Sequence, residues 1–154
     1  MPVAQIITGQ ESTVDTNPPI HSLIAFYKAF NAREADEAAF TWAKQYAVTM
    51  VNPLGGTLRN WNAIREWYGK IMDAEVRFYL EYHDYKIHQS DDVFYVDGRE
   101  RGSLQMPEYE LGLKLRTSRI FKLFGNEWKQ VHQHSSIDSA ELLQRYQQVT
   151  SNFI

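Results

Sequence analysis

Residues 111–123 read Leu-Gly-Leu-Lys-Leu-Arg-Thr-Ser-Arg-Ile-Phe-Lys-Leu, and this alternating pattern predicts a long β-strand. Successive side chains of a strand point to opposite faces of a sheet, so the odd positions share one face. Most of these odd positions are apolar: Leu111, Leu113, Leu115, Phe121 and Leu123. Arg119 has the same parity, so the pattern places a guanidinium in the middle of an apolar face.

The predicted position of Arg119 allows two interpretations. An unpaired charge in apolar surroundings is costly, so the guanidinium needs a partner. The first interpretation is a structural ion pair with Glu81, Glu100 or Glu110. The second is an anion-binding arginine on a pocket wall, because charges held in such surroundings often mark functional sites.

Residues 125–126, Gly-Asn, form a typical hairpin turn, and residues 128–135 form the predicted return strand. A two-residue turn pairs Phe124 with Glu127. This register places His132 opposite Arg119 and puts His134 on the same face. A three-residue loop shifts the register by one and exchanges the two faces of the return strand.

The three-residue loop covers residues 124–126 and leaves Asn126 in the left-handed conformation. Three residues of the return strand then join the face of Arg119: Val131, Gln133 and Ser135. Spacing alone does not decide between the two registers.

His132 and His134 form a His-x-His pattern that could bind a metal on one strand face. A metal site needs a third ligand. His83, His88 or a carboxylate could supply it, but the spacing predicts none of them beside the two histidines. We therefore expect ordinary packed or hydrogen-bonded histidines and no metal site.

The remaining segments predict helices and further strands around this hairpin. The predicted helices cover about residues 18–30, 34–44, 61–73 and 139–149, with caps at Asn17, Asn60 and Asp138. The predicted strands cover about residues 46–52, 76–88, 93–105, 109–123 and 128–135. This order predicts an α+β fold, in which a curved antiparallel sheet carries helices on its concave face. Such a cone encloses a cavity, which is the default place for a ligand.

The composition limits the class of protein. The 154 residues fit a single domain, which we expect over residues 17–154 behind a flexible N-terminal arm of residues 1–16. The net charge of −3 argues against nucleic-acid binding. There is no cysteine, which excludes disulfides and thiolate zinc sites. No apolar run approaches the roughly 20 residues of a membrane helix, and the first basic residue is Lys28, so we expect a cytoplasmic protein.

The sequence contains no glycine-rich phosphate-binding motif and no nucleophile-elbow motif. We therefore expect no cofactor.

Residues 116–136 read Arg-Thr-Ser-Arg-Ile-Phe-Lys-Leu-Phe-Gly-Asn-Glu-Trp-Lys-Gln-Val-His-Gln-His-Ser-Ser. This segment resembles the last hairpin of the nuclear transport factor 2-like superfamily. The nearest resemblance is to its SnoaL-like members and to the association domain of calcium/calmodulin-dependent protein kinase II. The resemblance covers about residues 18–137 and implies the cystatin-like α+β barrel. The superfamily includes enzymes, transport factors and oligomerisation modules, so the fold alone does not specify a function.

The resemblance also implies roles for particular residues. Arg119 matches a pocket arginine of the association domain, whereas a second pocket arginine falls at Ser135. This alignment favours the register that places Gln133 and Ser135 in the cavity. Tyr27 matches the active-site tyrosine of ketosteroid isomerase. The catalytic base of that enzyme falls at Asn52, whose amide cannot accept a proton at neutral pH.

The resulting hypothesis is a SnoaL-like domain that binds a small, partly apolar, anionic ligand in its cone. The expected ligand-binding residues are Tyr27, Asn52, Arg119, Gln133 and Ser135, with His132 and His134 replacing the last two in the other register. The first alternative is a lyase or isomerase acting on a small cyclic or carbonyl substrate, in which Tyr27 and Arg119 are the catalytic candidates. The second alternative is a homo-oligomerisation module. The superfamily resemblance also implies a homodimer.

Overall fold

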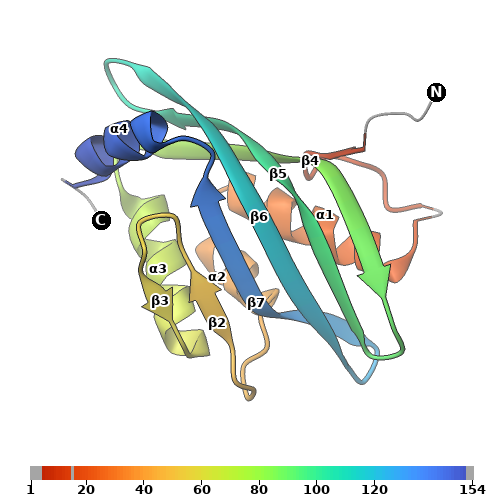
Figure 1. Ribbon diagram of the computed structural model, residues 1–154. Helices are drawn as coiled ribbons and strands as arrows, with labels where there is room; N and C mark the ends of the chain where they lie inside the picture. Colours follow the sequence, from red (N-terminus) through yellow and green to blue (C-terminus); the bar gives the residue numbers. More distant parts are fainter. Residues whose placement is uncertain (1–4, 15, 152–154) are drawn as a thin grey trace.

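The computed structural model describes residues 5–14 and 16–151, which form a curved sheet flanked by helices (Figure 1). The strand order is β1-β4-β5-β6-β7-β2-β3. The strands are β1 (Ile6–Ile7), β2 (Thr49–Val51), β3 (Thr57–Leu58), β4 (Arg77–Gln89), β5 (Val93–Gln105), β6 (Glu110–Phe124) and β7 (Glu127–Ile137). The pairing is antiparallel throughout, apart from the parallel pair β2–β7. The predicted α+β class with a curved sheet is therefore confirmed.

Four helices complete the described part of the chain: α1 (Pro18–Asn31), α2 (Ala35–Phe40), α3 (Trp61–Asp73) and α4 (Ala140–Thr150). Asn17 and Asn60 cap α1 and α3 as predicted, because each side-chain oxygen accepts a backbone N–H in the first turn. The prediction of Asp138 as the cap of α4 is wrong. The cap is Ser139, whose hydroxyl accepts the backbone N–H of Leu142 at 3.1 Å.

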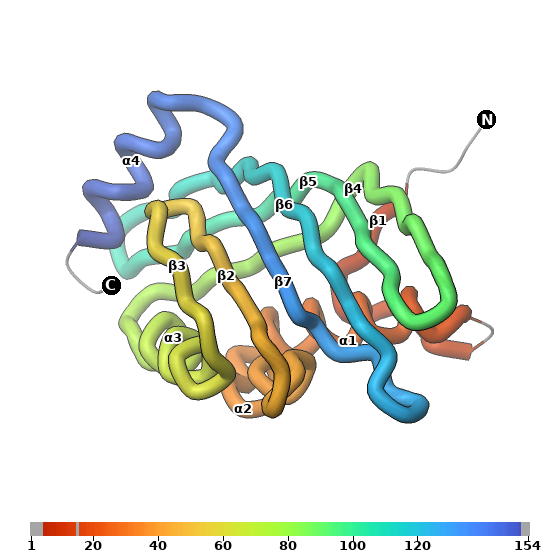
Figure 2. Tube along the Cα trace, turned by 60° about the horizontal axis from the view of Figure 1, so that its bottom comes forward, coloured from red at the N-terminus to blue at the C-terminus, as the bar shows by residue number. Residues whose placement is uncertain are grey.

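The helices and the sheet form two layers, with α4 at one end. Figure 2 shows α1, α2 and α3 on the same side of the sheet, and α4 beyond the end of β7. The inward face of β6 carries the alternating buried residues that the sequence predicts, from Leu111 to Phe121. None of the helices in the described ranges combines the length and the apolar character of a membrane span.

The N-terminal segment departs from the prediction of a flexible arm. Ile6 and Ile7 pair with β4, and the side chain of Ile7 is only 1% exposed. Gly9 has φ +94° and lies so close to α1 that a Cβ would sit 2.5 Å from the backbone nitrogen of Lys28. Only glycine fits this contact, which holds the segment against α1. The arm's residues 1–4 and 15 lie outside the described residues.

The strand predicted at residues 46–52 is shorter in the structure and has an unpredicted partner. It covers only Thr49–Val51, and it pairs in parallel with β7. The chain then turns at Gly55, where φ is +92°, and returns as β3. This short return strand at Thr57–Leu58 was not predicted.

The β6–β7 hairpin combines features of both predicted registers. Its turn has two residues, since Phe124 pairs with Glu127. A β-bulge then leaves Val131 unpaired, because Phe121 pairs with Gln130 whereas Ile120 pairs with His132. The extra residue exchanges the faces of β7, so Gln133 and not His132 lies opposite Arg119. The two-residue prediction was thus right about the turn and wrong about the face.

Candidate functional site

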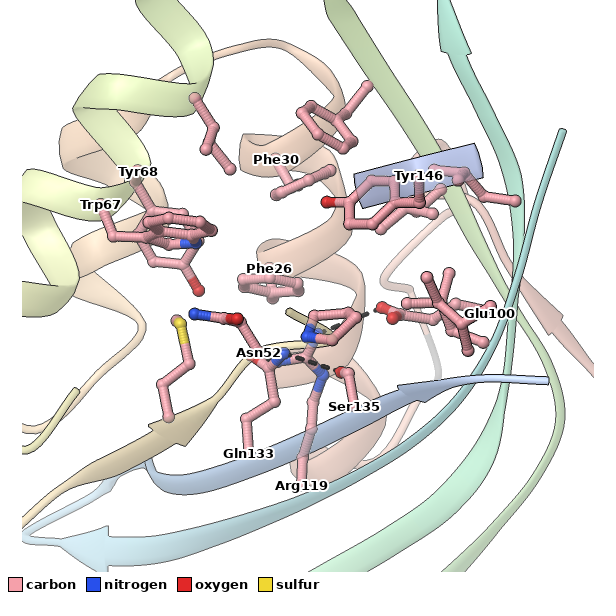
Figure 3. Close-up of a pocket in the computed structure, with 18 residues that line it drawn as sticks. Phe26, Phe30, Asn52, Trp67, Tyr68, Glu100, Arg119, Gln133, Ser135 and Tyr146 are labelled. Atoms are coloured by element: carbon pink, nitrogen blue, oxygen red, sulfur yellow. Dashed lines mark hydrogen bonds and ion pairs between the residues drawn. The ribbon is translucent and has the colours of Figure 1, made fainter. Parts of the chain in front are cut away.

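A cavity of about 70 Å³ lies between the concave face of the sheet and the helices. Figure 3 shows the residues that line it. Aromatic side chains from three helices form most of one wall: Phe26, Phe30, Trp67, Tyr68 and Tyr146. Five polar side chains line the cavity as well: Asn52, Glu100, Arg119, Gln133 and Ser135. The arrangement is the one typical of a small-molecule site, with apolar walls and a few fixed polar groups.

Arg119 and Glu100 form a buried ion pair at the polar end of the cavity. A guanidinium Nη atom lies 3.2 Å from the Glu100 carboxylate, and both side chains are only 2% exposed. The structure therefore confirms the ion-pair interpretation of Arg119 and selects Glu100 from the three candidate acids. The charge on which the expectation of an anionic ligand rested is balanced inside the protein.

Three donors hold the Glu100 carboxylate. Besides Arg119, the Tyr27 hydroxyl donates to it at 2.7 Å and the Thr117 hydroxyl at 2.6 Å. Burial raises the pKa of Tyr27 well above its ordinary value, so Tyr27 stays a protonated donor at neutral pH. Tyr27 is not among the described residues that line the cavity, but its hydroxyl donates to Glu100, which does line it.

Two glutamines hold the other side of the guanidinium. An Arg119 Nη atom donates to the side-chain oxygens of Gln130 and Gln133 at 2.7 and 2.9 Å. The Gln133 amide in turn donates to the hydroxyl of Ser135 at 2.9 Å. The guanidinium also packs over the ring of Phe26, with 4.1 Å between the guanidinium carbon and the ring centroid. These contacts fix Arg119 in one orientation.

Gln130 and Glu100 were missed as site residues although the sequence carries a signal for each. Gln130 pairs with Phe121 between the turn and the bulge, so the two-residue turn alone places it on the inward face. Glu100 has the parity of Phe94 and Val96 on its own strand. That alternation was a usable signal, because it places a carboxylate on an apolar face just as Arg119 is placed.

The cavity lining retains hydrogen-bond donors that the protein does not use. Arg119 Nε is buried and has no partner among the described residues. The side-chain oxygen of Asn52 accepts hydrogen bonds from the backbone N–H groups of Leu54 and Gly56. Its amide nitrogen has no acceptor among the described residues. The Tyr68 hydroxyl accepts a hydrogen bond from Trp42 at 3.0 Å, and burial raises the pKa of Tyr68, so its proton remains. The cavity lining can therefore donate further hydrogen bonds to a ligand.

The predicted site residues divide into three groups, the first of which is Tyr27 alone, outside the lining and bonded to Glu100. Asn52, Arg119, Gln133 and Ser135 all line the cavity, together with the ion-pair partner of Arg119. His132 and His134 lie on the opposite face, where they pair with Ile120 and Ser118 of β6. No group of three metal-binding side chains occurs within residues 5–14 and 16–151.

Comparisons with known proteins agree with this architecture. The family model for the SnoaL-like domain matches residues 21–139. No curated protein sequence matches the chain.

Solved structures from several bacteria share the fold. A proposed dehydratase of the nuclear transport factor 2-like family from Streptomyces avermitilis is 19% identical, with a TM-score of 0.70 over 80% of this chain and 95% of that chain. A proposed calcium/calmodulin-dependent protein kinase type II association domain from Thiobacillus denitrificans is 22% identical, with a TM-score of 0.63 over 79% and 95%. A ketosteroid isomerase-like protein from Erwinia carotovora atroseptica is 15% identical, with a TM-score of 0.66 over 83% and 99%. At such identities the similarity establishes the fold and not the activity.

Proposed function

The chain belongs to the SnoaL-like domain family, and we propose that it binds a small, largely apolar molecule that presents a hydrogen-bond acceptor to Arg119. The observation that carries this proposal is the unpartnered Nε of Arg119. A buried donor without a partner costs about 1–3 kcal/mol. An acceptor oxygen on a ligand would remove that cost, which favours binding of the ligand.

The charge balance of the cavity argues for a neutral ligand. Glu100 and Arg119 cancel each other, and the remaining polar lining consists of amides and hydroxyls. An additional anion or cation would lose its hydration without gaining an opposite charge. A ketone, lactone or ester offers an acceptor without a charge and suits the donors of Arg119, Asn52 and Tyr68.

The size of the cavity restricts the ligand further. Its volume of about 70 Å³ is well below that of a cavity known to hold benzene, about 150 Å³. A ligand of more than a few heavy atoms therefore requires the lining to move. Trp67 on α3 and Tyr146 on α4 form part of that lining and come from elements outside the sheet.

The same donors give the enzyme alternative its physical basis. Donors that converge on a carbonyl oxygen can stabilise negative charge that develops there. A lyase or isomerase also needs a base, and the described lining offers only Glu100, which already accepts three hydrogen bonds. Asn52 is an amide and cannot serve. We therefore place binding ahead of catalysis.

Three six-membered ring compounds test the proposal, because they match in shape and differ in polarity. Cyclohexanone has an acceptor, cyclohexylamine is a cation, and methylcyclohexane has no polar group. We expect ligand-detected NMR to show binding of cyclohexanone at least about tenfold tighter than the other two. Equal binding of methylcyclohexane would mean that no polar contact is made and would overturn the proposal.

A pair of matched variants tests the location of the site. Tyr68→Phe removes a donor from the cavity. Tyr82→Phe removes a buried hydroxyl that donates to the backbone oxygen of Thr117 at 2.8 Å, and Tyr82 does not line the cavity. Only Tyr68→Phe should weaken ketone binding. Native mass spectrometry of the freshly purified protein would reveal any ligand that co-purifies. Chemical conversion of the ketone by the protein would favour the enzyme alternative.

We also propose that the chain forms the expected homodimer, through the outer face of the sheet. A row of side chains crosses four strands there: Tyr95, Ile120, His132 and Thr49 are paired in succession. Tyr95 is 48% exposed, although it is a large aromatic residue. Exposed apolar surface of this kind is typical of a contact between subunits.

A further inference from the structure

A second hollow, of about 450 Å³, lies outside the central cavity between α4 and one edge of the sheet. Leu113 lines both spaces and so forms a wall between them. Three basic side chains line the hollow: Arg101 from β5, Lys114 from β6 and Arg145 from α4. We propose that this hollow binds the phosphate group of a phosphorylated small molecule, independently of the ligand in the central cavity.

The sheet brings like charges together at this place. Arg101 lies directly opposite Lys114, and in the next row of the same face Arg99 lies opposite Arg116. Like charges directly opposite each other on neighbouring strands are destabilising. An anion bound beside them would reverse that repulsion.

The described protein supplies few negative charges to this basic group. Among the described carboxylates, only that of Asp138 lies within 4 Å of these basic side chains, at 3.4 Å from Arg101 and 3.6 Å from Arg116. Glu81 lies opposite Arg101 on β4, but its oxygens bond the Tyr79 hydroxyl and the His83 ring.

Lys114 and Arg145 have no carboxylate within 4 Å in the described chain. Glu141 is the acidic residue in the lining. Three positive charges and one negative charge therefore line the hollow, and Asp138, at 3.4 Å from Arg101, adds a second negative charge beside it. The remaining excess of positive charge favours a phosphate monoester, which carries about −1.5 to −2 at neutral pH.

The shape of the hollow follows from where β7 ends. Ile137 is the last residue of β7 and pairs with Leu115, so the preceding part of β6 has no strand on that side. Gly112 lies in this part and lines the hollow. A Cβ at Gly112 would meet no described atom within 4 Å, so the absence of a side chain keeps the space open. Arginine forks and a lysine around an open space are the groups that bind phosphate oxygens.

Inorganic phosphate is the probe for the first experiment, at low ionic strength and mildly alkaline pH. We expect a saturable titration in ¹⁵N-correlated NMR spectra, with shifts centred on the amides of Gly112, Leu113 and Ser139. Lys114→Gln with Arg145→Gln should weaken binding about tenfold or more, because two charge-assisted contacts are lost. The matched control is Lys70→Gln with Lys86→Gln, which removes the same charge from exposed side chains elsewhere.

A second variant separates loss of binding from loss of the fold. Gly112→Glu introduces a carboxylate into open space and should abolish phosphate binding, while the rest of the spectrum is retained. Citrate in place of phosphate distinguishes a phosphate site from a general carboxylate site, and citrate binding of equal strength would contradict the proposed ligand class. An equal effect of the control variant, or no saturation in the wild-type protein, would overturn the proposal. None of these outcomes depends on whether cyclohexanone binds in the central cavity.

Discussion

Replacing Glu100 by glutamine should cause one of the largest stability losses available by a single isosteric change in this protein. The substitution removes the charge that balances Arg119, and both side chains are only 2% exposed. Breaking a buried pair by removing one partner typically costs about 3–5 kcal/mol, because the other charge stays buried and uncompensated. We expect Glu100→Gln to lower the free energy of unfolding by an amount in that range.

A surface ion pair provides the internal reference. Asp36 accepts a hydrogen bond from Arg65 at 2.9 Å, which is shorter than the buried contact, but both side chains are more than half exposed. Exposed pairs contribute about 0–1 kcal/mol. Asp36→Asn should therefore change the stability little, although the ion pair has the better distance.

Urea unfolding followed by circular dichroism measures both variants. With a slope of about 2 kcal/mol per molar, a loss of 3–5 kcal/mol moves the midpoint by roughly 1.5–2.5 M. The double variant Glu100→Gln with Arg119→Met removes the orphaned charge and should be more stable than Glu100→Gln alone. A loss no larger than that of Asp36→Asn, or a double variant less stable than the single one, would refute the assigned role of the pair.

Three further substitutions test other parts of the structure. Gly9→Ala should destabilise the protein by more than Gly55→Ala in urea unfolding: both positions have positive φ, which costs about 1–2 kcal/mol for alanine, but only Gly9 also meets backbone within 3 Å. Burial and the neighbouring His134 lower the pKa of His132, so the unfolded chain binds a proton first as the pH falls below about 6.5. The stability should therefore decrease below that pH, and His132→Gln should reduce this decrease in unfolding curves measured from pH 7.5 to 5. Ile120→Glu places a charge in the proposed dimer contact and should give a monomer in sedimentation velocity, whereas an unchanged dimer would exclude that face.

Local sequence patterns were sufficient to predict those elements whose position depends on one apolar face or one capping residue. The alternation of β6 predicted both the strand and the inward position of Arg119. The caps Asn17 and Asn60 were predicted because each stands directly before an apolar periodic segment. Such features depend on neighbours within a few residues, and the sequence displays those neighbours directly.

Long-range pairing was the part that local patterns could not supply. Ile6 and Ile7 become a strand only because β4 offers a free edge, and Thr49–Val51 run parallel to β7 only in the assembled sheet. The cavity residues Gln133 and Ser135 came from the family resemblance, which favoured the correct face. The bulge that produces this face depends on the packing of the whole hairpin.

The unpaired Val131 has a consequence for how this chain should be aligned with its relatives. If a relative lacks this one residue, a regular hairpin with a two-residue turn still places the equivalent of Gln133 opposite the equivalent of Arg119. The insertion is thus absorbed where it occurs, and the residues on both sides of it keep their partners. An alignment that opens its gap at Val131 compares cavity residues with cavity residues. An alignment without that gap compares His132 with Gln133 and assigns outward-facing imidazoles to the cavities of related proteins.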